Sequence, residues 1–435
     1  MEVTENQVIQ LSPDTASTKA GKKLATPSKW VKRFIHEKAI WGACQGSGKN
    51  PYTTMIDTTN LAFKCSCPSR KFPCKHSLGL LFLYAQSPDI FQEETELAEH
   101  VAEWIGKRET KEEKKATKVD KPVDEKAQQK RIAKRIKKMD AGIVELSLWL
   151  KDLVRTGIMN VPQQAYTFTK NIAARMVDAQ VPGIATKLQA LSQINFYEEG
   201  WQTELLRQVS KLYLLTSAYE QRAKLSEAWQ AEIKAQIGWN IAKEVVEKTI
   251  PVQDNWLVLS IKTEPLDTRL RMEKIWLYGQ ENQQFVHLLS FYANQQITKA
   301  IYLVDSVISA SVQYYPGIDN SRALVKKQTA TVTSFTPTGI ASFDDLFNSI
   351  SKKLANNPFA RELPFLMDKV SVRYTSEGCY LQDILGHAVP LKNDPTQAWE
   401  IMAASLGQPI TAFIIYDNQQ FTLLSILRNG ALIAF

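Results

Sequence analysis

Residues 65–76 read CSCPSRKFPCKH, and these twelve positions hold three of the five cysteines and one of the five histidines in the 435-residue chain. The spacing is Cys-x-Cys, six residues, and then Cys-x-His. On a strand, Cys65 and Cys67 point to the same face because they lie two positions apart. The gap contains two prolines and a serine, which allow the chain to turn back, so Cys74 and His76 can face the first pair.

These four side chains form a complete ligand set for a metal ion. Three thiolates and one imidazole in a tetrahedral arrangement are the ligands that structural zinc prefers. The sequence therefore predicts zinc as a cofactor, bound by Cys65, Cys67, Cys74 and His76. The alternative is a chance cluster of buried or reactive residues, which is uncommon at chelating spacing. Because four protein ligands leave no position for water, hydrolytic metal catalysis is not expected here.

This stretch resembles the SWIM-type zinc finger, whose pattern is Cys-x-Cys, a variable gap, and Cys-x-His. Upstream, the similarity to bacterial SWIM-finger proteins continues in Trp41-Gly42, CQGSGK at 44–49, Pro51-Tyr52 and Asp57. The clear similarity covers about residues 17–90, and a weaker one lies near 149–180. The resemblance implies a β-β-α unit with the first ligand pair on strands and the second pair at the start of a helix.

The resemblance also carries expectations about function. SWIM fingers are generally regarded as DNA-binding or protein-interacting modules, which implies a non-enzymatic interaction protein that binds nucleic acid or a protein partner. Bacterial relatives tend to be encoded near AAA-type ATPases and von Willebrand A-type proteins. This implies the alternative of a purely protein–protein adaptor of such a complex, with no nucleic-acid binding.

Around the zinc ligands, basic and aromatic side chains are the candidate contacts for such a partner. Arg70, Lys71, Phe72 and Lys75 combine charge with one aromatic ring, which suits phosphate contact and base stacking. The alternative is a set of solvated loop charges, with Phe72 tucked under the zinc site. Lys49 is a further candidate contact, because it ends a Gly-rich turn that can present backbone N–H groups to an anion.

That turn, Gly46-Ser47-Gly48-Lys49, is not a nucleotide-binding P-loop. The P-loop requires a glycine at the position of Ala43 and a serine or threonine at the position of Asn50. Cys379, Asp383 and His387 lie close in sequence, but nothing orients them as a nucleophile and a base. Cys44 is expected to be a small buried residue. No catalytic residues are predicted.

Composition and charge set the wider expectations. The 44% hydrophobic and 23% charged content is that of a soluble globular protein, and the cysteine usage indicates a reducing compartment. No secretory signal and no apolar run of the ~20 residues that a membrane helix needs are present, so a cytoplasmic protein with no membrane contact is expected. Residues 106–140 hold fourteen Lys or Arg against seven Asp or Glu, so most of the net charge of +8 lies there.

The sequence predicts a multidomain α+β protein in five parts. These are a mobile N-terminal segment at 1–29, a SWIM-type zinc-finger domain at 30–105, a charged linker at 106–124, a helical domain at 125–250 and an α+β domain at 251–435. In the finger, strands are predicted at 51–57 and 59–64 and a helix at 77–85. A short helix at 17–25 is also predicted, with Ser17 as its cap.

The helical domain is predicted to begin with one long helix over 125–156. Its apolar residues recur at spacings of four and three, at Ile132, Ile136, Met139, Ile143, Leu146, Leu150 and Leu153. This a/d seam favours packing against the following helices, predicted at 172–180, 184–194, 203–218 and 223–237, and a homodimeric coiled coil is the alternative. The other faces at its start are basic, with Lys130, Arg131, Lys134, Arg135, Lys137 and Lys138.

After Pro251, β-branched and aromatic residues between turn signals predict an α+β domain with a mostly antiparallel sheet. The predicted strands are 256–263, 271–278, 284–291, 300–315, 330–335, 370–374, 380–384, 410–417 and 421–427. Helices are predicted at 343–355, capped by Ser342, and at 398–406. Tyr416-Asp417-Asn418 is typical of a hairpin turn.

Overall fold

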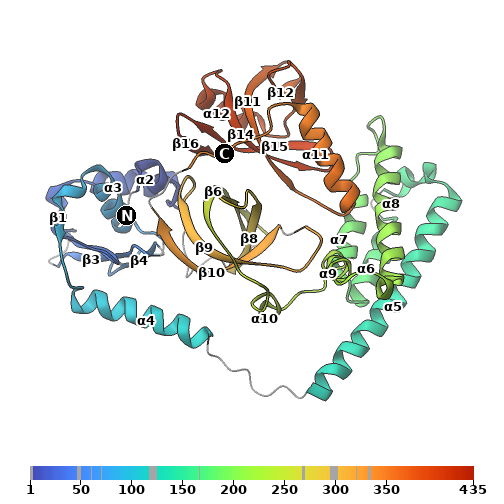
Figure 1. Ribbon diagram of the computed structural model, residues 1–435, viewed down its shortest axis with the longest axis horizontal. Coiled ribbons are helices and arrows are strands. Elements are labelled where there is room, and N and C mark those ends of the chain that lie inside the picture. The colour runs from blue at the N-terminus through green and yellow to red at the C-terminus, as the bar shows by residue number, and fades with distance from the viewer. Residues whose placement is uncertain are drawn as a thin grey trace.

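The computed structural model describes residues 3–46, 50–59, 61–69, 71–116, 125–165, 167–266, 270–293, 302–319, 321–331 and 335–435. Figure 1 shows the finger domain at one end and the helical bundle at the other, with the two β-rich parts between them. None of the helices in these ranges is long and apolar enough to span a membrane.

The finger domain is a five-stranded sheet between two layers of helix. Its elements are α1 (Glu5–Gln10), α2 (Thr15–Leu24), β1 (Trp30–His36), β2 (Ala39–Cys44), β3 (Tyr52–Asp57), β4 (Ala62–Cys65), α3 (Lys75–Gln86), β5 (Gln92–Glu93) and α4 (Glu99–Ala116). The strand order is β4-β3-β2-β1-β5. Helix α3 is apolar all round and packs between this sheet and α1 and α2, so almost all of its side chains are buried.

The N-terminal segment differs from the mobile segment predicted for residues 1–29. Val3 and Val8 lie in the same core as α3, and α2 packs along α3. Helix α1 begins with a capping box in which Thr4 and Gln7 bond each other's backbone N–H groups. Helix α2 is capped by Asp14 and not by Ser17. Residues 3–29 therefore belong to the folded finger domain.

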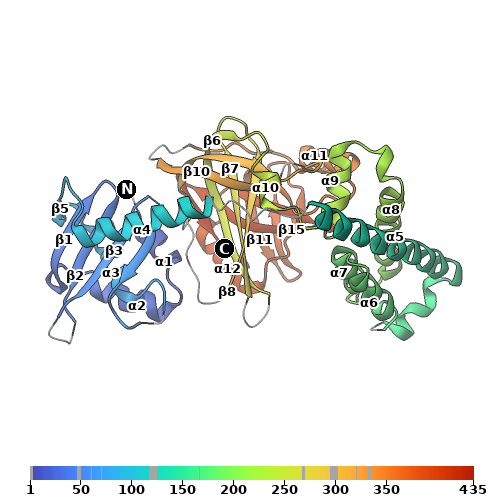
Figure 2. The same cartoon turned by 90° about the horizontal axis from the view of Figure 1, so that it is seen from below.

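Helix α4 covers the opposite face of the sheet, where Figure 2 shows it crossing the strands. Its apolar side chains Val101 and Ile105 pack on Trp41 and Met55. At its centre, Arg108 reaches the buried carboxylate of Asp57, at 3.6 Å between Nε and Oδ2. The helix continues to Ala116, so the first half of the linker predicted at 106–124 is helical and Arg108 is part of the finger domain. Residues 117–124 lie outside the described residues.

The helical domain contains α5 (Glu125–Thr156), α6 (Lys170–Asp178), α7 (Pro182–Leu191), α8 (Trp201–Glu220), α9 (Glu227–Gln236) and α10 (Lys243–Val246). The seam of α5 packs within the chain: Met139, Ile143, Leu146 and Leu150 are buried in the bundle core. This confirms the packing interpretation of the seam. Ile132 and Ile136 at its start remain exposed, and a homodimer through 125–156 stays a prediction.

The C-terminal part forms two β structures where the sequence predicts one domain. The first is a closed barrel, in the order β10-β8-β7-β6-β9, made of β6 (Val252–Pro265), β7 (Leu270–Gly279), β8 (Phe285–Ala293), β9 (Val307–Tyr314) and β10 (Arg322–Thr331). Strand β10 pairs in parallel with β8 to close it. Strand β10 begins at Arg322, before the strand predicted at 330–335, of which residues 332–334 lie outside the described residues. The prediction missed the start of β10 because Lys326, Lys327 and Gln328 give this strand a polar sequence.

The second is a six-stranded sheet in the order β13-β12-β11-β14-β15-β16. Its elements are α11 (Phe343–Asn356), β11 (Leu363–Thr375), β12 (Gly378–Gln382), β13 (Ala388–Pro390), α12 (Pro395–Ser405), β14 (Ile410–Asp417), β15 (Gln420–Arg428) and β16 (Ala431–Ala434). All of its strand pairs are antiparallel, as predicted. Asp417 pairs with Gln420 across a two-residue turn with positive φ at Asn418 and Gln419, which confirms the hairpin.

Both faces of the six-stranded sheet are covered. Helices α11 and α12 cover one face. The other face packs on the barrel, where Phe413 and Leu424 contact Trp276 and Leu257 in a shared core. The barrel and the sheet are therefore one continuous hydrophobic unit.

Candidate metal centre

The four predicted ligands come together at the junction of β4 and α3. Cys65 ends β4, and Cys67 follows it by two positions. Cys74 is the N-cap of α3, and His76 lies in the first turn of that helix. One ligand atom from each residue lies within 4.8 Å of every other one. The second pair lies at the start of a helix, as the resemblance implies, whereas of the first pair only Cys65 is on a strand and Cys67 lies in the bend that follows it.

The geometry fits a tetrahedral ion. Cys65 Sγ and His76 Nδ1 are 3.8 Å apart. Zinc bonds of about 2.3 Å to sulfur and about 2.1 Å to nitrogen place tetrahedral ligand atoms about 3.5–3.8 Å apart. Cys74 and His76 are buried and Cys65 and Cys67 are half-buried, so solvent access is limited. The residues present therefore fit a closed structural zinc site.

Neighbouring groups orient the ligands and bond to the sulfur atoms. Thr54 Oγ1 lies 3.3 Å from Cys65 Sγ, and the Ser77 amide donates to Cys74 Sγ at 3.5 Å. The amides of Cys67 and Ser69 donate to the sulfur atoms of Cys65 and Cys67. Such N–H···S bonds stabilise thiolates. They are favourable here because three thiolates and one Zn²⁺ leave the site with one net negative charge.

The thiols influence each other's ionisation. A hydrogen bond from Cys65 lowers the pKa of Cys74 to about 3, and the same bond and burial raise the pKa of Cys65. Burial also raises the pKa of Cys67. Three adjacent thiolates repel one another unless a cation neutralises them. Zinc supplies that charge and, by joining β4 to α3, supplies folding free energy to the domain.

The aromatic and basic neighbours of the site have different environments. The ring of Tyr52 lies 4.7 Å from that of His76, so it covers the imidazole. Phe72 is 37% exposed, and its ring packs edge-on against Phe63 at 6.0 Å. It is therefore partly tucked under the site and partly available to a partner.

Of the candidate basic contacts, Lys75 is exposed at the start of α3. Lys71 donates to Asp14 Oδ2 at 2.7 Å and so connects the ligand loop to the N-terminus of α2. Lys49 and Arg70 lie outside the described residues. The sequence alone does not identify Asp14 as the partner of Lys71, because the two residues lie 57 positions apart.

The remaining candidates have structural environments. Cys44 is fully buried in the finger core. Asp383 accepts hydrogen bonds from the amides of Phe343, Leu385 and His387, so its carboxylate holds the start of α11 and a loop. Cys379 lies in the core of the sheet.

Comparisons with known proteins match two parts of the chain. Residues 61–85 match the family of the SWIM zinc finger, and residues 134–237 match that of the SWIM-associated four-helix bundle domain. No curated protein and no solved structure matches the chain. The two matched regions coincide with the metal centre and with the bundle of α5 to α9. The chain therefore contains a SWIM zinc finger, with the ligands Cys65, Cys67, Cys74 and His76, followed by a SWIM-associated four-helix bundle domain.

Proposed function

We propose that this zinc-binding interaction protein binds nucleic acid through exposed cations on its finger and on the first half of α5. Because four protein ligands fill the zinc shell, the metal is structural. Recognition of a partner then depends on the side chains that the protein exposes. The observation that carries the proposal is the row of exposed cations on α5: Lys130, Arg131, Lys134, Lys137 and Lys138.

Among the described residues, no carboxylate pairs with any of these five side chains. Unpaired cations on one helix are what a phosphate backbone attracts, since each contact releases counterions. On the finger, Lys64 and Lys75 are exposed near the zinc ligands, and Phe72 offers part of a ring for stacking. We propose Lys49, Arg70 and Lys71 as further contacts. Lys71 would contact nucleic acid after its ion pair with Asp14 breaks.

The test is a salt titration of binding to single- and double-stranded DNA by fluorescence anisotropy. The variants are Lys75→Gln and a triple change of Lys130, Lys134 and Lys137 to Gln. Lys170→Gln, at the exposed start of α6, is the matched control. We expect the triple variant to reduce the slope of log K against log salt by about 3, because each phosphate contact contributes about 0.9. Equal slopes for the triple variant and the control would contradict the proposal.

A second candidate, a protein adaptor, is favoured by a different surface. On the six-stranded sheet domain, the rings of Tyr374 and Trp399 lie 4.8 Å apart, and they are 39% and 57% exposed. Exposed aromatic pairs are typical of protein-docking sites. An adaptor would bind DNA weakly, and its affinity would not respond to the lysine changes above.

A further inference from the structure

The strands of the barrel follow a recognisable order. Strands β6, β7 and β8 form an antiparallel meander, β10 pairs in parallel with β8, and β9 lies between β10 and β6, antiparallel to both. Strand β6 pairs with β9 over residues 252–257 and with β7 over residues 256–265. Numbered within the barrel, the order is 1-2-3-5-4-1, which is the topology of the OB-fold. OB-folds bind oligonucleotides or oligosaccharides on the face of their second and third strands and with the loops that follow the first and fourth strands.

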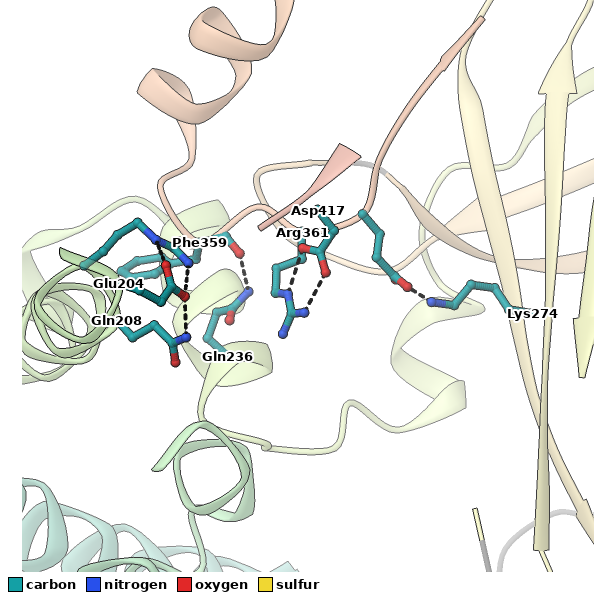
Figure 3. Close-up of polar contacts among 9 residues, drawn as sticks. Glu204, Gln208, Gln236, Lys274, Phe359, Arg361 and Asp417 are labelled. Atoms are coloured by element: carbon teal, nitrogen blue, oxygen red, sulfur yellow. Dashed lines mark hydrogen bonds and ion pairs between the residues drawn. The ribbon is translucent and has the colours of Figure 1, made fainter. Parts of the chain in front are cut away.

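A shared topology does not establish a function, so the side chains on this face must be considered. In this chain the six-stranded sheet covers the part of the face that belongs to β7, the second strand of the barrel. Trp276 and Tyr278 of β7 are buried in the core that the barrel shares with the sheet. Lys274 of β7 forms an ion pair with Glu362, which directly precedes β11 (Figure 3). The part of the face left for a ligand therefore lies on β8, the third strand, and on its neighbour β10.

The outer side of β8 exposes an aromatic ring. Side chains of a strand alternate between its two faces, and Val286 and Leu288 lie in the barrel core. Phe291 is an odd number of positions from both, so it lies on the outer face, where its side chain is 49% exposed. An exposed ring on this strand offers a surface on which a nucleic-acid base can stack.

Strand β10 adds exposed cations next to β8. It runs parallel to β8 from the pair formed by Arg322 and His287, and Phe291 and Lys326 each follow that pair by four positions. Lys326 and the next residue, Lys327, are both exposed. In Figure 1, β9 and β10 lie on the side of the barrel away from the six-stranded sheet, so the sheet does not cover these lysines.

Arg322, at the start of β10, lies beside the loop that joins β9 to β10. Its guanidinium is 4.1 Å from the centroid of the Tyr315 ring in that loop, so the ring supports one face of the group. Its Nε is buried and has no acceptor among the described residues. In the described part of the chain, Arg322, Lys326 and Lys327 form no ion pair with a carboxylate. Three unpaired cations on one strand favour a polyanion over a neutral oligosaccharide.

We infer that the outer surface of β8 and β10, with Phe291, Arg322, Lys326 and Lys327, binds single-stranded nucleic acid. This inference rests on the proposed nucleic-acid function and adds to it a ligand class and a location on the barrel. The cations contact phosphates, and Phe291 stacks on a base. In a duplex the bases stack on one another and their faces are not available to Phe291, so the barrel surface discriminates in favour of single strands.

The test measures binding of an oligothymidylate and of a duplex of equal length to the full-length zinc-loaded protein by fluorescence anisotropy. The variants are Phe291→Ala and a double change of Lys326 and Lys327 to Gln. Helix α11 supplies the matched controls: Phe347→Ala, where the ring is also exposed, and a double change of its exposed neighbours Lys352 and Lys353 to Gln.

We expect Phe291→Ala to bind the oligothymidylate about tenfold more weakly and the duplex with unchanged affinity, because a base stacks on the ring only in a single strand. The double lysine variant should reduce the slope of log K against log salt for the oligothymidylate by about 1.4, since each phosphate contact of a single strand contributes about 0.7. The α11 controls should match the wild type. Circular dichroism before titration verifies that each variant is folded.

The triple variant of α5 separates this inference from the proposed function. If the α5 variant reduces the salt slope while both barrel variants match their controls, the barrel site is wrong and the proposed function stands. If the barrel variants weaken binding and the α5 variant does not, the barrel site stands and the contact of α5 with nucleic acid is wrong. A wild-type protein that binds no DNA would overturn both. If Phe291→Ala weakens binding of neutral maltohexaose and not of the oligothymidylate, the assignment to nucleic acid is wrong.

Discussion

The ring of Phe359 packs edge-on against that of Trp229, with 6.3 Å between the centroids, across the boundary between the six-stranded sheet domain and the bundle. Phe359 is buried among bundle residues, although it belongs to the segment between α11 and β11. The carbonyl of Phe359 also accepts a hydrogen bond from Gln236 of α9, at 3.4 Å. The SWIM-associated bundle therefore completes its core with a side chain from the C-terminal sheet domain.

This contact predicts that Phe359→Ala destabilises the bundle and loosens it from the sheet domain. Truncating a buried phenylalanine leaves a cavity and costs about 3–5 kcal/mol. Limited proteolysis between α9 and β6, together with the thermal midpoint, measures both effects. Phe347→Ala on α11, where the ring is 43% exposed, is the control and should cost less. Equal effects of the two changes would show that Phe359 does not join the domains.

The metal centre predicts that zinc and the fold of the finger domain are lost together. Cys67→Ser removes one of four ligands, and we expect the bound zinc measured by elemental analysis to fall from one equivalent to well below one. Hydrogen exchange in residues 3–116 should then accelerate, because metal binding supplies folding free energy.

Cys44→Ala is the control for this change, since Cys44 is buried nearby but belongs to the finger core and not to the ligand set. It should retain one equivalent of zinc. A Cys67→Ser protein with full zinc content and unchanged exchange would refute the ligand assignment.

The metal site could be predicted from the sequence because its ligands lie within twelve residues and their spacing alone determines which atoms meet. The hairpin at Asn418 and the helix capped by Ser342 were predictable for the same reason, since both are local. Helix α1 also has a local signal that the sequence interpretation missed, the capping pair Thr4 and Gln7.

Long-range relationships could not be predicted in this way. The parallel pairing of β8 with β10 closes the barrel, and the insertion of Phe359 joins the bundle to the sheet domain, yet neither contact leaves a periodic or spaced pattern in the sequence. Lys71 resembles any loop lysine until the fold brings Asp14 beside it. Electrostatic contacts of this kind depend on tertiary packing, which a single sequence does not reveal.

Two glycines of the helices α4 and α5 predict opposite effects of the same substitution. A Cβ at Gly142 would clash with Ala179 Cβ, so Gly142→Ala forces α5 away from α6 and should destabilise the bundle by about 1–3 kcal/mol. Outside its own helix backbone, a Cβ at Gly106 in α4 would meet no atom of the described residues within 4 Å, and Gly106→Ala should stabilise its helix by about 0.5–1 kcal/mol. Denaturant unfolding of both variants measures these changes, and a destabilised Gly106→Ala or a neutral Gly142→Ala would contradict the described packing.

The half-buried position of Lys187 predicts a pH-dependent stability. Its pKa is lowered in the folded protein to about 8 from an ordinary value of 10.5, so the unfolded chain binds more protons between these values. Stability therefore rises with pH through this range, as Lys187 loses its charge. Lys187→Met should be more stable than the wild type at pH 7, and the difference should shrink as the pH approaches 10. Thermal unfolding in phosphate-free buffer measures this difference, and the exposed Lys151→Met should show none. A constant difference across the pH range would mean that the charge of Lys187 is not destabilising.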